Sequence, residues 1–255
     1  MSAADASEGE PTQQIPPHAG WLKAAVVLAT LMQVLDMTIA NVALPHMRAA
    51  LGANQESLSW VLTSYILASA VVLPATGWLS DRIGRRTLYL ASVCFFIFAS
   101  VLCGLAATLE QMVLFRILQG VSGAFLTPLA QTVLLDSTPP EKHGRAMAMF
   151  GMGVVLGPVL GPITGGWLTD NLDWRWVFYV NVPIGLIAIT GLWLLLPDVK
   201  RPLRRFDITG FTLLAVALAS LQLMLDRGEG QDWFDSLEIW IEMIMAISAL
   251  WMFAI

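Results

Sequence analysis

Long apolar runs separated by short polar stretches dominate this chain of 255 residues. A helix needs roughly 20 apolar residues to cross a bilayer core of about 30 Å. Eight runs approach that length: Trp21–Leu44, Leu58–Leu79, Thr87–Ala107, Gln111–Leu135, Ala146–Leu168, Trp176–Leu196, Ile208–Leu225 and Ile239–Ile255. Each must be helical, because lipid leaves an unpaired backbone amide without a partner. The dyad alternation of a β-barrel is absent, so the pattern predicts an all-α membrane protein.

The composition supports lipid as the solvent for most of the chain. Hydrophobic residues make up 56% of the sequence and charged residues only 13%, whereas a soluble domain carries roughly 25% charged residues. Cys94 and Cys103 lie in one apolar run, so neither a disulfide framework nor a metal-site spacing is present. No P-loop, zinc-protease helix or dinucleotide-binding glycine pattern occurs. We therefore expect no enzyme, no ATP-driven transport, no metal and no nucleic-acid partner.

Basic residues orient the predicted helices, because Lys and Arg concentrate in cytoplasmic loops. Ten of the fourteen lie on one side of the bundle: Lys23, Arg82, Arg85, Arg86, Lys142, Arg145, Lys200, Arg201, Arg204 and Arg205. Arg48, Arg175 and Arg227 lie on the other side. This asymmetry predicts a multi-pass protein with its N-terminus in the cytoplasm.

The order of these features predicts four regions. Residues 1–20 are polar and contain prolines, as in a disordered cytoplasmic tail. Residues 21–197 hold six spans, residues 198–207 form a basic cytoplasmic linker, and residues 208–255 hold two more spans. The last span carries Glu242 and stops without a flanking anchor, so we expect it to be truncated and the chain to be the N-terminal part of a longer protein.

Two charges lie inside apolar runs, where an ionised side chain costs at least a few kcal/mol. Asp36 is in the first run and Arg116 in the fourth. From the helical rise, Asp36 lies about 12 Å and Arg116 about 9 Å from the outer ends of their spans. The similar depths would allow the two to pair. One interpretation is a purely structural ion pair; the other is that Asp36 takes up a proton or a cationic substrate while Arg116 adjusts its proton affinity.

Further polar residues lie inside the spans. Thr38 and Asn41 follow Asp36 on the first helix and are expected to hydrogen-bond across the bundle or to contact substrate. Other candidate cavity-lining residues are Gln33, Tyr65, Gln119 and Gln131. Interhelical hydrogen bonds and substrate contacts are both open for each of them.

The run Gly120-Val-Ser122-Gly123 raises the alternative of an intramembrane serine protease. That chemistry needs a histidine at membrane depth to activate the serine. The histidines, His18, His46 and His143, lie in the tail or at loop positions, which argues against this reaction.

The loop between the second and third spans has glycines at both ends, a pattern that lets two helices approach closely. Its motif residues are Gly77, Asp81, Arg82, Gly84, Arg85 and Arg86. Asp81 is expected to pair with the arginines or to lie against a helix N-terminus. The alternative interpretation is an ordinary basic loop.

The fifth span carries glycines at every fourth position, which places them on one helix face for close helix contact. The series comprises Gly153, Gly157, Pro158, Gly161, Pro162, Gly165 and Gly166. The two prolines each remove a helical hydrogen bond and are expected to bend the segment.

Five segments together resemble the major facilitator superfamily, and within it the fourteen-helix drug:proton antiporters. These segments are Leu35–Pro45, Gly77–Arg86, Arg116–Gly120, Gly153–Gly166 and Trp174–Gly185. The resemblance covers about residues 20–255 in the family's order and spacing. Met112 and Ser122 depart mildly from the pattern of the fourth span.

The resemblance implies a major facilitator fold, of which this chain holds the N-terminal six-helix bundle and two central linker helices. It implies export of lipophilic or cationic drugs in exchange for protons, driven by the proton gradient without a cofactor. Asp36, Arg116, Thr38 and Asn41 would form the proton-coupling or substrate site. The Gly77–Arg86 loop would act as a conformational switch.

The resemblance also implies that the glycine face of the fifth span meets the other half of the transporter. It implies a bacterial inner membrane and, in Gram-negative members, a periplasmic adaptor protein and an outer-membrane channel as partners. A carrier for another solute, working as a metabolite exporter or a symporter, and a non-transporting truncated remnant remain alternatives.

Overall fold

The computed structural model describes residues 19–198 and 205–255, and every regular element in these two ranges is a helix. Eight helices or helix combinations within them are long and apolar enough to cross a membrane. This confirms the predicted all-α membrane fold. Most of the predicted tail and of the basic linker lies outside the described residues.

Fifteen helical segments make up the described chain. Their bounds are α1 (Ala19–Leu51), α2 (Gln55–Val72), η1 (Leu73–Ala75), α3 (Thr76–Ile83), α4 (Arg85–Leu105), α5 (Leu109–Gly123), α6 (Leu126–Asp136), η2 (Pro140–Lys142), α7 (His143–Asn171), α8 (Trp176–Tyr179), α9 (Asn181–Leu195), α10 (Ile208–Arg227), η3 (Glu229–Gln231), η4 (Trp233–Asp235) and α11 (Leu237–Ala254).

Side-chain caps begin three of these helices. Asn54 and Ser57 form a reciprocal capping box at the start of α2, with Asn54 Oδ1 accepting from the Ser57 amide at 2.6 Å. Thr108 caps α5, and Asp207 caps α10 by accepting from the Gly210 amide at 2.8 Å. Each cap satisfies backbone donors that the first helical turn leaves without partners.

Three of the predicted spans are broken helices, and each break lies near a proline. Pro74 is in η1, between α2 and α3; Pro128 is the third residue of α6; and Pro183 is the third residue of α9. Proline lacks the N–H that would bond to the carbonyl four residues earlier. A missing backbone donor therefore accompanies each of these breaks.

Proline does not interrupt the first and fifth spans. Pro45 lies inside α1, which continues to Leu51 and ends before Gly52, whose φ is +62°. The predicted end of this span at Leu44 is therefore too early, because hydrophobicity marks the lipid-buried part of a helix and not its continuation into water. Pro158 and Pro162 likewise lie inside the uninterrupted α7.

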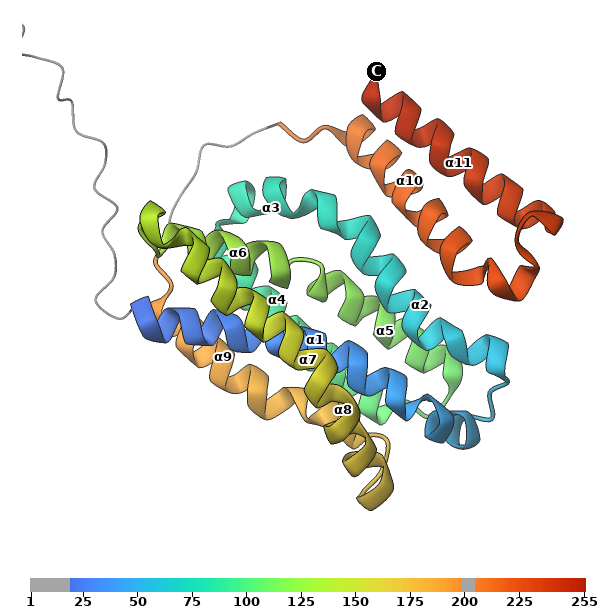
Figure 1. Cartoon of the computed structure of the whole chain (residues 1–255), viewed down its shortest axis with the longest axis horizontal. Helices are drawn as coiled ribbons and strands as arrows, with labels where there is room; N and C mark the ends of the chain where they lie inside the picture. The colour runs from blue at the N-terminus through green and yellow to red at the C-terminus, as the bar shows by residue number, and fades with distance from the viewer. Residues whose placement is uncertain (1–18, 199–204) are drawn as a thin grey trace, which may run out of the picture.

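Helix α1 occupies the middle of the bundle. It packs against α7, α9, α6 and α2 (Figure 1). The buried apolar residues form two clusters along it, one around Met32 and Phe96 and one around Ile39 and Phe178. The hairpin of α10 and α11 lies outside this bundle, with α10 packed along α2 (Figure 1).

Large apolar side chains cover the outer faces of the helices. On α7 these are Met152, Val155, Val159, Ile163 and Trp167, all exposed. An exposed apolar face of this length is unfavourable in water and is the normal lipid contact of a membrane helix. The chain is therefore a multi-pass membrane protein.

Candidate functional site

The two charges within the spans meet in the middle of the bundle. Arg116 Nη1 on α5 donates to Asp36 Oδ2 on α1 at 2.6 Å, and both side chains have 0% exposure. The pairing that the sequence predicted from similar depth is confirmed. A charge-assisted hydrogen bond of this length is among the stronger kinds in proteins.

Two side-chain amides donate to the other oxygen of the same carboxylate. Gln119 Nε2 lies 2.8 Å and Asn181 Nδ2 lies 2.6 Å from Asp36 Oδ1. An ionised carboxylate only accepts hydrogen bonds, whereas a protonated one also donates. An environment of three donors therefore suits Asp36 as the ionised carboxylate.

Arg116 is anchored on several sides. Its Nε donates to the backbone carbonyl of Val61 at 3.0 Å, and its Nη1 also donates to Gln119 Oε1 at 2.7 Å. The guanidinium carbon lies 4.4 Å from the centre of the Tyr65 ring and 5.9 Å from that of Phe178. These cation–π contacts, strongest away from water, fix the orientation of the positive charge beside Asp36.

Close helix contacts bring these groups together. At Gly120 on α5 a Cβ would collide with the backbone carbonyl of Tyr65 on α2. At Gly157 and Gly161 on α7 a Cβ would collide with Val34 and Thr38 on α1. Glycine is required at these points because the backbones approach too closely for a side chain.

The glycine face of α7 corrects one expectation. Gly153, Gly157, Gly161 and Gly165 are buried against α1 of the same bundle, while the exposed side of α7 carries large apolar residues. The prediction that this face meets the other half of a transporter is therefore wrong. The glycines allow α7 to pack closely against α1, the helix that carries Asp36.

Thr38 reaches across the bundle as predicted, but shares its one hydroxyl proton with its own helix. Its Oγ1 lies 3.2 Å from the backbone carbonyl of Gly157 on α7, and 3.1 Å and 3.0 Å from those of Val34 and Leu35 on α1. Asn41 is exposed, and among the described residues no hydrogen bond of its side chain reaches another helix. The structure thus brings Thr38, but not Asn41, to the helix contact that supports the site.

The other polar candidates also divide into residues that belong to the site and residues that lie away from it. Gln119 and Tyr65 contact Arg116 and belong to the site. Gln33 accepts a hydrogen bond from Thr127 Oγ1 on α6 at 3.0 Å, so it joins two helices. Gln131 is exposed.

Sequence reasoning missed three members of the network: Asn181, Ser100 and Cys103, whose thiol donates to Gln119 Oε1 at 3.6 Å. Asn181 Nδ2 also donates to Ser100 Oγ at 2.9 Å, and both residues have 0% exposure. The available signal was an asparagine inside an otherwise apolar sixth span, where a polar side chain needs a partner. Within residues 19–198 and 205–255 there is no group of three or more His, Cys, Asp or Glu that could hold a metal ion.

The loop between α3 and α4 has a different geometry from the expected one. Gly77 is exposed inside α3, and a Cβ there would meet nothing within 4 Å, so it is not a point of close helix approach. Gly84 joins the two helices with φ +89°, a conformation that L-residues rarely adopt. Of the two loop glycines, only Gly84 has a structural requirement.

The arginines of this loop find partners other than Asp81. Arg85 is buried and pairs with Asp136 at the end of α6. Arg86 Nη2 donates to the backbone carbonyl of Trp193 at 2.6 Å, and Arg82 lies 5.3 Å from the Trp78 ring. The predicted pairing of Asp81 with the arginines is therefore not what the structure shows. Asp81 instead lines a hollow of about 350 Å³.

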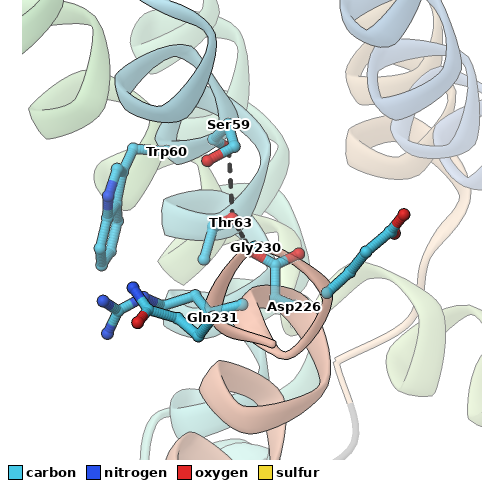
Figure 2. A pocket seen from close by; sticks show the side chains of 8 residues that line it. Ser59, Trp60, Thr63, Asp226, Gly230 and Gln231 are labelled. Atoms are coloured by element: carbon cyan, nitrogen blue, oxygen red, sulfur yellow. Dashed lines mark hydrogen bonds between the residues drawn. The ribbon is translucent and has the colours of Figure 1, made fainter. Parts of the chain in front are cut away.

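A larger hollow, of about 640 Å³, lies between α2 and the end of α10. Figure 2 shows Thr63 at its centre, between Ser59 and Asp226. The Thr63 hydroxyl donates to Asp226, and the same oxygen lies 3.2 Å from the backbone carbonyl of Ser59. This contact joins the α10–α11 hairpin to the bundle.

Comparisons with known proteins agree with this architecture. The family profile of the Major Facilitator Superfamily matches residues 26–255. The "Multidrug export protein EmrB" of Haemophilus influenzae is 43% identical over 248 residues, which covers 95% of this chain and 49% of that protein. The "Fatty acid resistance protein FarB" of Neisseria gonorrhoeae is 45% identical over 230 residues, covering 88% of this chain and 45% of that protein. The chain spans about half the length of the curated relatives it matches.

Solved structures share the fold at low sequence identity. The POT family transporter PepTSo matches with a TM-score of 0.64 and 12% identity, covering 89% of this chain and 51% of that chain. The inward-open xylose transporter XylE of E. coli matches with a TM-score of 0.63 and 18% identity, covering 83% of this chain and 57% of that chain. The profile match over most of the chain and the shared fold lead to one conclusion: this chain belongs to the Major Facilitator Superfamily.

Proposed function

We propose that this chain supplies the first bundle of a proton-coupled exporter of lipophilic or cationic small molecules, and that it is a transport protein and not an enzyme. The buried carboxylate of Asp36, held by Arg116, Gln119 and Asn181, carries the proposal. The relatives support the substrate class, because their names describe multidrug export and fatty acid resistance.

Burial explains why Asp36 suits proton coupling. An ionisable group at membrane depth is expensive and marks a proton or ion path by default. Its charge is balanced by Arg116, and two amides donate to its other oxygen. A proton on this carboxylate adds an O–H that needs an acceptor, whereas the three groups that now face it donate, so the protonation of Asp36 is linked to the packing of α1, α5 and α9.

The distribution of Lys and Arg supports the proposed orientation, with the N-terminus in the cytoplasm of a bacterial cell and the bundle in its inner membrane. The proton gradient would supply the energy. A periplasmic adaptor and an outer-membrane channel are proposed partners, to be tested by co-purification from cross-linked membranes.

Substitution of Asp36 tests the proposal. Asp36→Asn, expressed from the chain's own gene in an efflux-deficient host, should abolish resistance to lipophilic cations and substrate-induced proton release from membrane vesicles. Insertion into the membrane fraction should be unchanged, because the apolar run that carries residue 36 is retained, although Arg116 is left without its counter-charge. Asp170→Asn is the matched control, since Asp170 is exposed and lies 3.9 Å from His46, far from the network.

Two outcomes would contradict the proposal. Export that survives Asp36→Asn would show that the carboxylate is not the coupling group. Substrate accumulation in cells expressing the wild-type gene would indicate a symporter.

A further inference from the structure

A chain of hydrogen bonds connects Asp36 to the break in the sixth span. Asn181 Nδ2 donates to Asp36 Oδ1 at 2.6 Å and to Ser100 Oγ at 2.9 Å. Ser100 donates to the backbone carbonyl of Phe178 at 2.9 Å. All four residues are buried, with at most 1% exposure. The chain therefore runs without solvent from α1 through α9 and α4 to α8.

The end of this chain is a discontinuous piece of helix. Helix α8 ends at Tyr179 and α9 begins at Asn181. Pro183 has no N–H to offer the carbonyl of Tyr179, so the helix lacks one of its regular bonds here. Ser100 supplies a side-chain bond to the carbonyl of Phe178 just before the break. The geometry of the junction thus depends partly on a side chain that Asn181 holds.

Only the nitrogen of the Asn181 side-chain amide makes hydrogen bonds among the described residues. Its Nδ2 serves two acceptors, whereas its Oδ1 is buried without a hydrogen-bond partner among the described residues. A protonated Asp36 would need an acceptor for its O–H, and rotation of the Asn181 side chain by a half-turn would present Oδ1 to it. Gln119 cannot rotate in this way without giving up the hydrogen bond that its Oε1 accepts from Arg116.

We propose that Asn181 is the positioning residue that transmits the protonation state of Asp36 to the junction between α8 and α9. With Asp36 ionised, Asn181 donates to it and fixes Ser100. With Asp36 protonated, Asn181 turns its oxygen to the carboxyl group, Ser100 reorients toward that oxygen, and the carbonyl of Phe178 is released. The inference rests on the proposed function only in taking Asp36 as the group that gains and loses a proton.

Other ionisable groups near Asp36 must be separated from it in any measurement. Arg116 faces it from α5, Tyr65 lies nearby on α2, and Cys103 on α4 is near the pair. From α9 the facing group is the amide of Asn181, which does not titrate. Infrared difference spectra resolve a carboxylic acid from a guanidinium, a phenol and a thiol, and subtraction of the Asp36→Asn spectrum assigns the band to Asp36.

The test follows two signals over a pH series on the purified protein in lipid. One is the carboxylic-acid band of Asp36; the other is amide hydrogen exchange of residues 176–185, measured at each pH and expressed as a protection factor, which corrects for the pH dependence of intrinsic exchange. In the wild type both should change with the same midpoint. Asn181→Leu removes the amide that donates to the carboxylate, so the Asp36 band should differ from that of the wild type. Protection at the junction should then no longer depend on pH.

Two further variants keep the test decisive. Ser100→Ala should leave the Asp36 midpoint unchanged and abolish the pH dependence of protection, and it serves where Asn181→Leu fails to fold. Asn171→Ala removes an exposed asparagine that bonds only to its own helix and should match the wild type in both signals.

Two results would overturn the inference: wild-type behaviour of both signals in Asn181→Leu, or exchange at the junction that does not follow Asp36 in the wild type. If the carboxylic-acid band of Asp36 does not change over the pH series, the proposed proton coupling is refuted instead. The two failures are therefore distinguishable.

Discussion

Two clusters of opposite charge in this chain have similar distances and different surroundings. Arg116 and Asp36 lie 2.6 Å apart with no exposure. Arg227 lies 2.9 Å from Glu238 and 3.6 Å from Glu242, and it joins α10 to α11 with 32% of its side chain exposed. Removing one member of a buried pair leaves an unbalanced charge, whereas solvent screens the members of an exposed pair. Burial, more than distance, therefore distinguishes the candidate functional site from an ion pair that only joins two helices.

A substitution of Arg116 tests this comparison most directly, because it removes one member of the buried pair. Arg116→Met should lower the free energy of unfolding by about 3–5 kcal/mol, because Asp36 would remain buried and unpaired. Thermal unfolding in detergent, followed by circular dichroism, measures the loss. The double variant Asp36→Leu/Arg116→Met should recover most of this stability without recovering transport. A stable Arg116→Met single variant would show that burial does not make this pair exceptional.

The contact that buries Asp36 gives the next largest effect. Gly161→Ala should cost about 1–3 kcal/mol, because its Cβ would press against Thr38 and force α1 and α7 apart. Gly151→Ala on the same helix is the control, since its Cβ would meet nothing within 4 Å. Alanine at position 151 should be neutral or slightly stabilising. Equal melting temperatures for the two variants would refute the importance of the α1–α7 contact.

The smallest effect is expected at the partly exposed cluster of Arg227, Glu238 and Glu242, whose side chains are 32%, 60% and 13% exposed. Arg227→Gln should change stability by about 0.2–1 kcal/mol and leave the bundle unfolding as in the wild type. Melting at low and high salt distinguishes the two clusters, because screening acts on exposed pairs and little on buried ones. A loss as large as that of Arg116→Met would contradict the comparison.

The sequence alone was enough to predict the features that depend on depth in the membrane. Apolar run lengths located the eight spans, and the helical rise placed Asp36 and Arg116 at one level. Depth does not determine how each helix is rotated about its axis or which neighbours it has. The partners of Asn181 and Ser100 therefore follow from the packing of α9 against both α1 and α4, which depth alone does not determine.

Helix contacts were the second limit of the sequence. Glycine spacing on α7 correctly predicted a close approach, but not that α1 would be the partner. Asp81 and Arg85 are close in sequence, yet Arg85 reaches Asp136, because the direction of a side chain at a helix end depends on the turn before it. Here that turn is set by Gly84 at φ +89°.

The buried pair of Asp36 and Arg116 sums to no net charge. A proton on the carboxylate leaves one positive charge without a counterion, in a region where the low dielectric lets that charge repel other cations strongly. A cationic molecule that approached the same carboxylate would repel the incoming proton for the same reason. Occupancy by one would thus exclude the other, which is the electrostatic condition for exchanging two cations across a membrane through a single acidic residue.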